Sequence, residues 1–183
     1  PLSKLFVDEI QPKTTGGVVG ITGHVLQVKY FQLTTSQITP YPTTNTDMAI
    51  PNFTVNITPK STSSIIKLEA NIMFESANTT ENIMWFFYRN TTKLGNTQPS
   101  SGSRKLGISP TVIGYSSVDN DSTPEFATLT YFDTPSSTSS IDYKLGVTAV
   151  GTSNLFINRT GTDTDTVARE RGVSFISVTE IGG

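Results

Sequence analysis

The chain has 183 residues, of which 35% are hydrophobic and only 15% are charged, and its formal net charge is −2. It contains no cysteine, which excludes disulfides and thiol chemistry. Its Lys and Arg residues form no cluster of the kind that binds nucleic acid, and no stretch approaches the roughly 20 apolar residues of a membrane helix. Much of the remaining sequence is Ser and Thr, residues that suit turns and pleated strands and predict a mostly β protein with a thin core.

The first 23 residues differ from the rest of the chain. A short alternating stretch is followed by a Gly-rich turn over residues 12–17 and then by a short apolar strand. Two small strands cannot bury a core alone, so they must pack on the main domain or on other copies. We predict that residues 1–23 form an anchoring or stem segment, whose candidate interface residues are Leu5, Val7, Ile10, Val18, Val19 and Ile21.

A first group of strands follows this segment. Residues 24–35 predict a long strand, and the next segment, which contains Pro40, Pro42 and Pro51, predicts a long loop. Residues 53–57 and 66–74 alternate between apolar and polar side chains, the pattern of half-buried strands. The turn before the next strand is expected over residues 77–82.

Residues 83–88, IMWFFY, are apolar on both sides of an extended chain. This pattern predicts a strand buried twice, by the core on one face and by another sheet or subunit on the other. Trp85 and Phe87 are therefore candidate interface residues. Stacking of these aromatic side chains on a sugar is an alternative, although such a run more often belongs to a core.

The later half of the chain repeats the alternating pattern. Residues 126–132 and 141–149 predict two strands separated by a Pro/Ser-rich turn, and we expect this pair to form one layer of a sandwich. Further strands are expected over residues 111–117, 155–157 and 173–181, with a polar loop over 158–172. No helical period persists. Eight to ten strands at this spacing predict an all-β protein, an antiparallel β-sandwich of jelly-roll type formed by residues 24–183.

The sequence offers little chemistry. His24 is the only histidine, so clusters of imidazole ligands are excluded, and we interpret it as a residue at the start of a strand. Pairs of acidic residues that could serve a glycoside hydrolase are Asp163 with Asp165, Asp119 with Asp121, Glu69 with Glu75, and Glu170 with Glu180. The first two pairs lie in turns, where Asp commonly caps backbone amides.

Asp163 and Asp165 are also candidate calcium ligands, because the segment Thr162–Thr166 supplies several oxygens. The segment lacks the spacing and the glycine of an EF-hand loop. We predict no catalytic residue, no bound metal and no cofactor, and we expect that the chain is not an enzyme.

Four stretches resemble one group of proteins: VDEIQPKTTGGVVGITGHV, TPKSTSSIIKLEANI, LTYFDTPSSTSSIDYKLGV and NRTGTDTDTVARERGVSFISVTEIGG. They resemble virion structural proteins of aquatic tailed phages, including those of cyanophage type, and related proteins of aquatic viruses. In that group the first pattern often joins the stem of a tail fibre or capsid appendage to a distal domain. The resemblance implies a jelly roll similar to the tumour-necrosis-factor-like domains, assembled as a homotrimer in the virion.

Three functions remain open from the sequence. The first is the head of a fibre or appendage that attaches to a glycan or protein of the host surface, with residues 1–23 contacting other virion proteins. The second is a capsid decoration, or cement, protein that stabilises the head shell. The third is a glycan-degrading tail enzyme, which would need a cleft with two carboxylates. The resemblance implies adhesion or decoration and supplies no active site.

Overall fold

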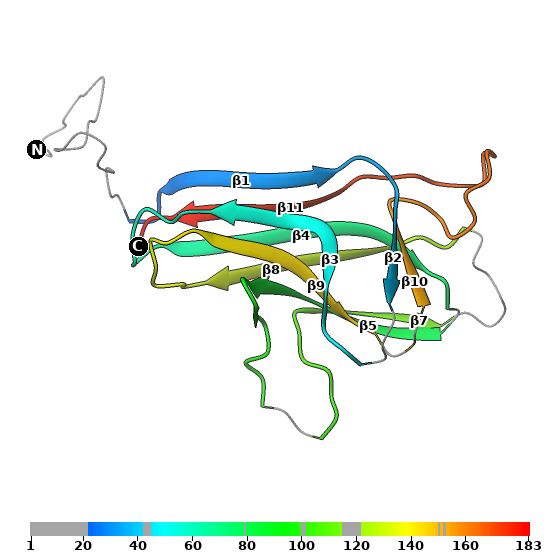
Figure 1. Ribbon diagram of the computed structural model, residues 1–183, viewed down its shortest axis with the longest axis horizontal. Helices are drawn as coiled ribbons and strands as arrows, with labels where there is room; N and C mark the ends of the chain where they lie inside the picture. The colour runs from blue at the N-terminus through cyan, green and yellow to red at the C-terminus, as the bar shows by residue number, and fades with distance from the viewer. Residues whose placement is uncertain are drawn as a thin grey trace, which may run out of the picture.

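The computed structural model describes residues 22–41, 45–78, 80–99, 102–114, 122–149, 151 and 153–183, and within them the chain forms eleven β-strands in two antiparallel sheets (Figure 1). Sheet A consists of β1 (Val25–Leu33), β2 (Gln37–Tyr41), β4 (Ile65–Ser76), β8 (Glu125–Asp133), β10 (Ser153–Ile157) and β11 (Ser174–Ile181). Sheet B consists of β3 (Met48–Ile57), β5 (Thr80–Arg89), β6 (Thr92–Lys93), β7 (Ser109–Gly114) and β9 (Ile141–Thr148).

The strand order identifies the architecture. In sheet A the long strands lie in the order β1, β11, β4 and β8, and in sheet B in the order β3, β9, β5 and β7. Eight antiparallel strands divided between two sheets in this interleaved order form a jelly roll. The short strands β10 and β2 extend sheet A beside the last residues of β4, and β6 pairs with the last two residues of β5 in sheet B. The predicted all-β sandwich of jelly-roll type is confirmed.

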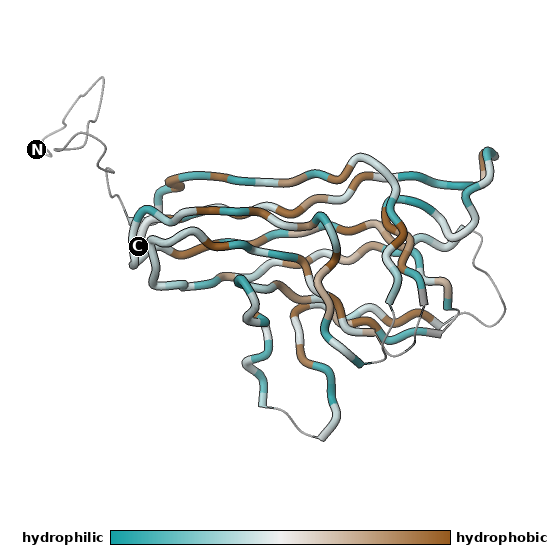
Figure 2. Tube along the Cα trace, viewed as in Figure 1, coloured by the Kyte–Doolittle hydropathy of each residue, from teal (hydrophilic) through white to brown (hydrophobic). Residues whose placement is uncertain are grey.

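The core lies between the two sheets and follows from the alternation in the sequence. Along β4 every second side chain from Ile66 to Phe74 is fully buried, and apolar residues alternate with polar ones along the strands in Figure 2. Phe74 of sheet A meets Trp85 of sheet B edge to face, with ring centroids 4.9 Å apart. An aromatic pair of this geometry contributes about 0.5–1.5 kcal/mol beyond the area it buries.

The proline-containing segment after β1 differs from the prediction. It contains β2 and the first residues of β3 instead of one long loop. Pro40 lies in β2, which pairs only with β10, and Pro51 lies in β3 where the register with β9 shifts. Edge strands and bulges tolerate proline because the missing N–H has no partner to satisfy there. Pro42 lies outside the described residues.

The two strands expected to form one layer belong to different sheets. β8 pairs with β4 in sheet A, whereas β9 lies between β3 and β5 in sheet B. The Pro/Ser-rich turn over residues 134–140 therefore crosses from one sheet to the other. Both strands have the same alternation because each buries one face in the same core, so the pattern alone does not reveal their separation.

Glu180 is a buried carboxylate on β11, at the end of the sandwich where the described chain begins and ends. Its Oε1 accepts hydrogen bonds from the Ser64 hydroxyl and the Lys60 backbone N–H, both at 2.6 Å. Its Oε2 accepts one from Gln27 Nε2, also at 2.6 Å. Burial alone would raise the pKa of Glu180, but these hydrogen bonds outweigh it and hold the pKa below its usual value.

The lowered pKa makes the stability of the fold depend on pH. The charged carboxylate contributes stability at pH values above the ordinary pKa of a glutamate, and the contribution is lost as the pH falls through the folded-state pKa. We expect Glu180→Gln to lower the free energy of unfolding by about 1–3 kcal/mol near neutral pH and by much less near pH 3. Urea denaturation at both pH values measures this. An equal loss at the two pH values would contradict the assignment.

Candidate assembly surface

The outer face of sheet A consists of the side chains of four strands that point away from the core. We define it by the registers that join β1, β11, β4 and β8. Its members are Val28, Tyr30, Gln32, Phe175, Ser177, Thr179, Lys67, Glu69, Asn71, Phe126, Thr128, Thr130 and Phe132.

Large apolar side chains stand exposed on this face. Tyr30 is 73% exposed, Phe126 61% and Phe132 57%, and they are joined by Val28 and Phe175. Tyr30 lies on one edge strand of the sheet and both phenylalanines lie on the other. The strands between them carry hydroxyl and amide side chains, Phe175 and the Lys67–Glu69 pair. Single exposed apolar residues are normal on a protein surface, so the notable feature of this face is that five of them share it.

This face also lacks unbalanced charge. Lys67 and Glu69 are its only charged members, and they form an ion pair of 2.8 Å with each other. Because both side chains are about one third exposed, the pair contributes little to stability. It does leave the face electrically neutral, so a second copy of the same face would meet no uncompensated charge.

The side chains of Trp85 and Phe87 do not lie at a surface. Both are fully buried and belong to the cluster between the sheets, so the prediction that they contact another subunit is wrong. They point into the core together with Ile83. Burial between the two sheets therefore explains why these positions are apolar.

The outer side of β5 is covered by other residues of the same chain. Phe86 is fully buried on the outer face of sheet B, with the Lys93 ammonium 4.0 Å above its ring and the Tyr88 ring 5.1 Å away. Gly146 of β9 makes room for this ring, because a Cβ at that position would lie 2.3 Å from a ring carbon. On this side, where the sequence predicted another sheet or subunit, Lys93 and Tyr88 of the same chain lie against the Phe86 ring.

The N-terminal interface candidates Leu5, Val7, Ile10, Val18, Val19 and Ile21 lie outside the described residues. The described chain begins beside its own C-terminal end, where the Gly23 N–H donates to the Gly182 carbonyl over 2.7 Å. The division of the chain at residue 23 stays a prediction.

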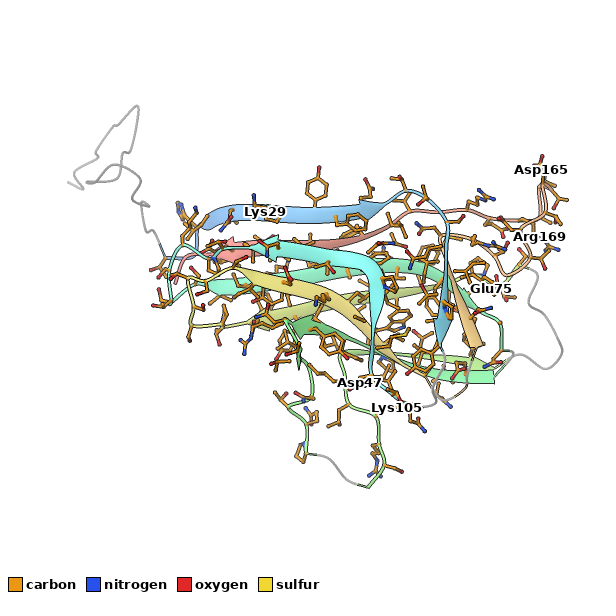
Figure 3. All side chains as sticks on the ribbon, viewed as in Figure 1. Lys29, Asp47, Glu75, Lys105, Asp165 and Arg169 are labelled. Carbon is orange, nitrogen blue, oxygen red and sulfur yellow. The ribbon has the colours of Figure 1, made fainter. Side chains whose placement is uncertain are left out.

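The calcium candidates lie in the loop between β10 and β11. Both oxygens of Asp163 accept hydrogen bonds from the Arg171 guanidinium, at 3.1 and 2.7 Å, and Arg159 lies 3.4 Å from the same carboxylate. Asp165 is exposed at the tip of this loop, near Arg169 (Figure 3). Two guanidinium groups occupy Asp163 and would repel a cation. Among the described residues, no three His, Asp or Glu side chains form a group that could hold a metal ion.

The other sequence candidates have structural roles or lie outside the described part. His24 is exposed just before β1, and its carbonyl accepts a hydrogen bond from the Gly182 N–H. Glu69 is paired with Lys67, and Glu170 accepts a hydrogen bond from the Ser122 hydroxyl. Asp119 and Asp121 are not among the described residues. The described part also contains no helix that is long and apolar enough to cross a membrane.

Comparison with known proteins gives a likeness of fold only. No protein-family model matches the chain, and no curated protein matches it. Among solved structures, the Gx strain of infectious bursal disease virus and the VP2 subviral particle of that virus each match 97% of this chain, with a TM-score of 0.39 and 10% identity. The Gt strain gives the same TM-score and identity. The chain spans less than half the length of these proteins, 46%, 46% and 45% respectively.

Proposed function

We propose that the chain is a structural protein of a virus particle, in which three copies pack through the outer face of sheet A to form the head of an appendage. In this proposal residues 1–23 contact other virion proteins, and the assembled head meets the host surface. The sequence resemblance to phage virion proteins supports the virion setting. The observation that carries the assembly is the exposure of Tyr30, Phe126 and Phe132 on one neutral sheet face.

The energetics favour an apolar assembly contact. Removing a large side chain such as Phe from water contributes about 1.5–3 kcal/mol. Five partly exposed side chains of this kind can therefore offset much of the roughly 4–15 kcal/mol that association costs in lost freedom. The neutral Ser, Thr and Asn residues between them can form hydrogen bonds, and the only charges that the contact would cover are those of the Lys67–Glu69 pair, which compensate each other.

We also propose that the chain does not catalyse a reaction. Glu69, Glu170 and Glu180, which the sequence offered as members of carboxylate pairs, each have another partner in the fold. Asp163 is held by two arginines. A glycan-degrading site would instead need two carboxyl groups facing each other across a substrate cleft.

The assembly can be tested by mass. Purified protein is expected to have about three times the 19.8 kDa mass of one chain by light scattering. Tyr30→Glu combined with Phe132→Glu should shift the mass to that of one chain, because each change places a charge in the proposed contact. Val112→Glu is the matched control, since Val112 is 72% exposed but lies in sheet B. A monomeric wild-type protein at micromolar concentration, or equal dissociation by the control, would contradict the proposal.

The position of the protein on the particle tests the virion role. Antibody labelling of particles of the virus that encodes the chain should mark a tail or an appendage tip. Labelling over the lattice of the head shell would instead indicate the capsid decoration protein that the sequence left as an alternative. Absence from purified particles would contradict both.

A further inference from the structure

A polar cleft lies on sheet B, on the other side of the sandwich from the proposed assembly surface. Its volume is about 370 Å³, within the range of small-ligand sites, and it opens between the start of β3, the end of β9 and the loop over residues 94–108. Asp47 and Lys105 mark it in Figure 3, at the root of the loop that projects from the sandwich.

The loop is fixed to the sheet at its base. The Leu94 N–H donates to the Phe87 carbonyl over 2.7 Å, and the Ile108 N–H donates to the Trp85 carbonyl over 2.8 Å. Gly107 lets the returning limb approach β5, because a Cβ there would lie 2.4 Å from the side chain of Met84. The cleft is therefore bounded by backbone that is hydrogen-bonded to the sheet on both limbs.

The cleft carries an excess of positive charge, although the whole chain has a net charge of −2. Three cations line it, namely Lys93, Arg104 and Lys105, against one carboxylate, Asp47. That carboxylate is already engaged, since Lys93 Nζ lies 2.9 Å from its Oδ1 and the Thr148 hydroxyl donates to the same oxygen. The charge of Asp47 is thus matched by Lys93, while the lining as a whole holds more cationic than acidic side chains.

Lys105 is the best candidate in the cleft to bind an anion. Among the described residues it forms no salt bridge, and its ammonium donates to the Asn82 carbonyl over 3.0 Å. Desolvation by burial lowers the pKa of Lys105, with a smaller opposing effect of the Glu81 charge. An anion in the cleft would add to the charge compensation of this partly buried ammonium.

The uncharged groups around these cations suit a hydroxylated ligand. Asn45, Asn96 and Ser103 add amide and hydroxyl groups to the same cleft. Next to it lies a second depression of about 300 Å³, whose lining includes Tyr88 and Lys144. The two depressions adjoin, because Tyr88 of the second is paired in the sheet with Lys93 of the first. An aromatic ring beside amides, hydroxyls and lysines presents both the apolar face and the hydrogen-bonding groups that a sugar chain requires.

We propose that this face of sheet B binds an acidic polysaccharide, with a sugar carboxylate in the cleft at Arg104 and Lys105 and the adjoining sugar against Tyr88 and Lys144. The inference goes beyond the proposed assembly and does not require it, because the site is formed by one chain. If copies do pack through sheet A, this face stays available on every copy, and binding to a surface polysaccharide becomes multivalent.

The test compares two sugars of the same shape. An oligogalacturonate tetramer is titrated into the full chain by calorimetry, beside the same tetramer with its carboxylates methyl-esterified. We expect the acid form to bind at least tenfold more tightly than the ester. Lys105→Gln should weaken binding of the acid tetramer at least tenfold. Lys29→Gln should leave it unchanged, since Lys29 lies on β1, remote from the cleft (Figure 3).

Two further measurements distinguish binding of a saccharide from binding of other anions. Lys144→Gln should weaken binding of the tetramer but not of a single galacturonate, because only the longer ligand reaches the second depression. An oligothymidylate of equal charge and inorganic sulfate should bind at least tenfold more weakly than the tetramer. The proposal is overturned if acid and ester bind alike, if sulfate or the oligonucleotide competes equally, or if Lys29→Gln is as damaging as Lys105→Gln. Circular dichroism of each variant verifies that the fold is retained.

Discussion

Replacing Asn158 by alanine is expected to lower the free energy of unfolding by about 3–5 kcal/mol, among the largest losses for a single polar side chain. Asn158 follows β10 and is 1% exposed. Its Nδ2 donates to the Leu33 carbonyl over 2.7 Å and to the Thr35 carbonyl over 3.1 Å. Its Oδ1 accepts a hydrogen bond from the Ser174 hydroxyl at 2.5 Å. One side chain thus joins the ends of β1, β10 and β11.

The large value has two physical sources. Removing the amide deprives the buried Leu33 carbonyl of its Nδ2 donor and the buried Ser174 hydroxyl of its acceptor, and a lost hydrogen bond at a buried group costs about 1–3 kcal/mol. Asn158 also has a φ of 61°, a left-handed conformation that asparagine adopts more readily than alanine.

Chemical denaturation of Asn158→Ala measures the loss, with the denaturant dependence of the unfolding free energy expected to stay the same. Asn56→Ala is the control, because Asn56 also donates two side-chain hydrogen bonds, to Ser140 and Asp142, but at an exposed site. The control should cost about 1 kcal/mol or less. A loss for Asn158→Ala no greater than that of the control would contradict the role assigned to this residue.

The sequence predicts strands well where one face of the strand is exposed to solvent and the other is buried. The alternation over residues 66–74, 126–132 and 173–181 reappears as the burial pattern of β4, β8 and β11. The same alternation does not say which sheet a strand joins, nor which face meets solvent when both carry apolar residues. Phe126 and Phe132 turn outward although Ala127 and Leu129, between them, turn inward. Aromatic size alone would have predicted the reverse.

No local sequence pattern marks the residues of the polar cleft as members of a binding site. Asp47, Lys93, Lys105 and Thr148 are far apart in the sequence, and the fold brings them together where β3, β6 and β9 meet the projecting loop. Each is a single polar residue at a strand end or in a loop, where the sequence favours an ordinary solvated role. The structural role of Asn158 could not be predicted for the same reason. Asn158 begins a polar loop, and the sequence does not show that this first residue of the loop is buried.

Replacing Asp133 by alanine is the second change with a large expected effect, a loss of about 2–4 kcal/mol. Asp133 ends β8 in sheet A and is 7% exposed. Its carboxylate lies 3.0 and 3.2 Å from Nη1 of Arg89 on β5, and it accepts a hydrogen bond of 2.7 Å from the hydroxyl of Tyr143 on β9. These contacts fasten sheet A to sheet B beside the crossing turn. Alanine would remove the countercharge of Arg89 and leave the buried Tyr143 hydroxyl without this acceptor.

Tyr143 is held in its protonated, donating form. Burial raises its pKa, and the hydrogen bond to Asp133 and the charge of that carboxylate raise it further. Tyr143→Phe therefore removes one hydrogen bond and leaves the Arg89 ion pair in place, so it should cost only about 1 kcal/mol. Glu69→Ala is the matched control for the ion pair, since the exposed Lys67–Glu69 pair contributes at most about 1 kcal/mol. Urea denaturation of the three variants ranks them. If Asp133→Ala costs no more than Glu69→Ala, the contact between the sheets is not stabilised by this carboxylate.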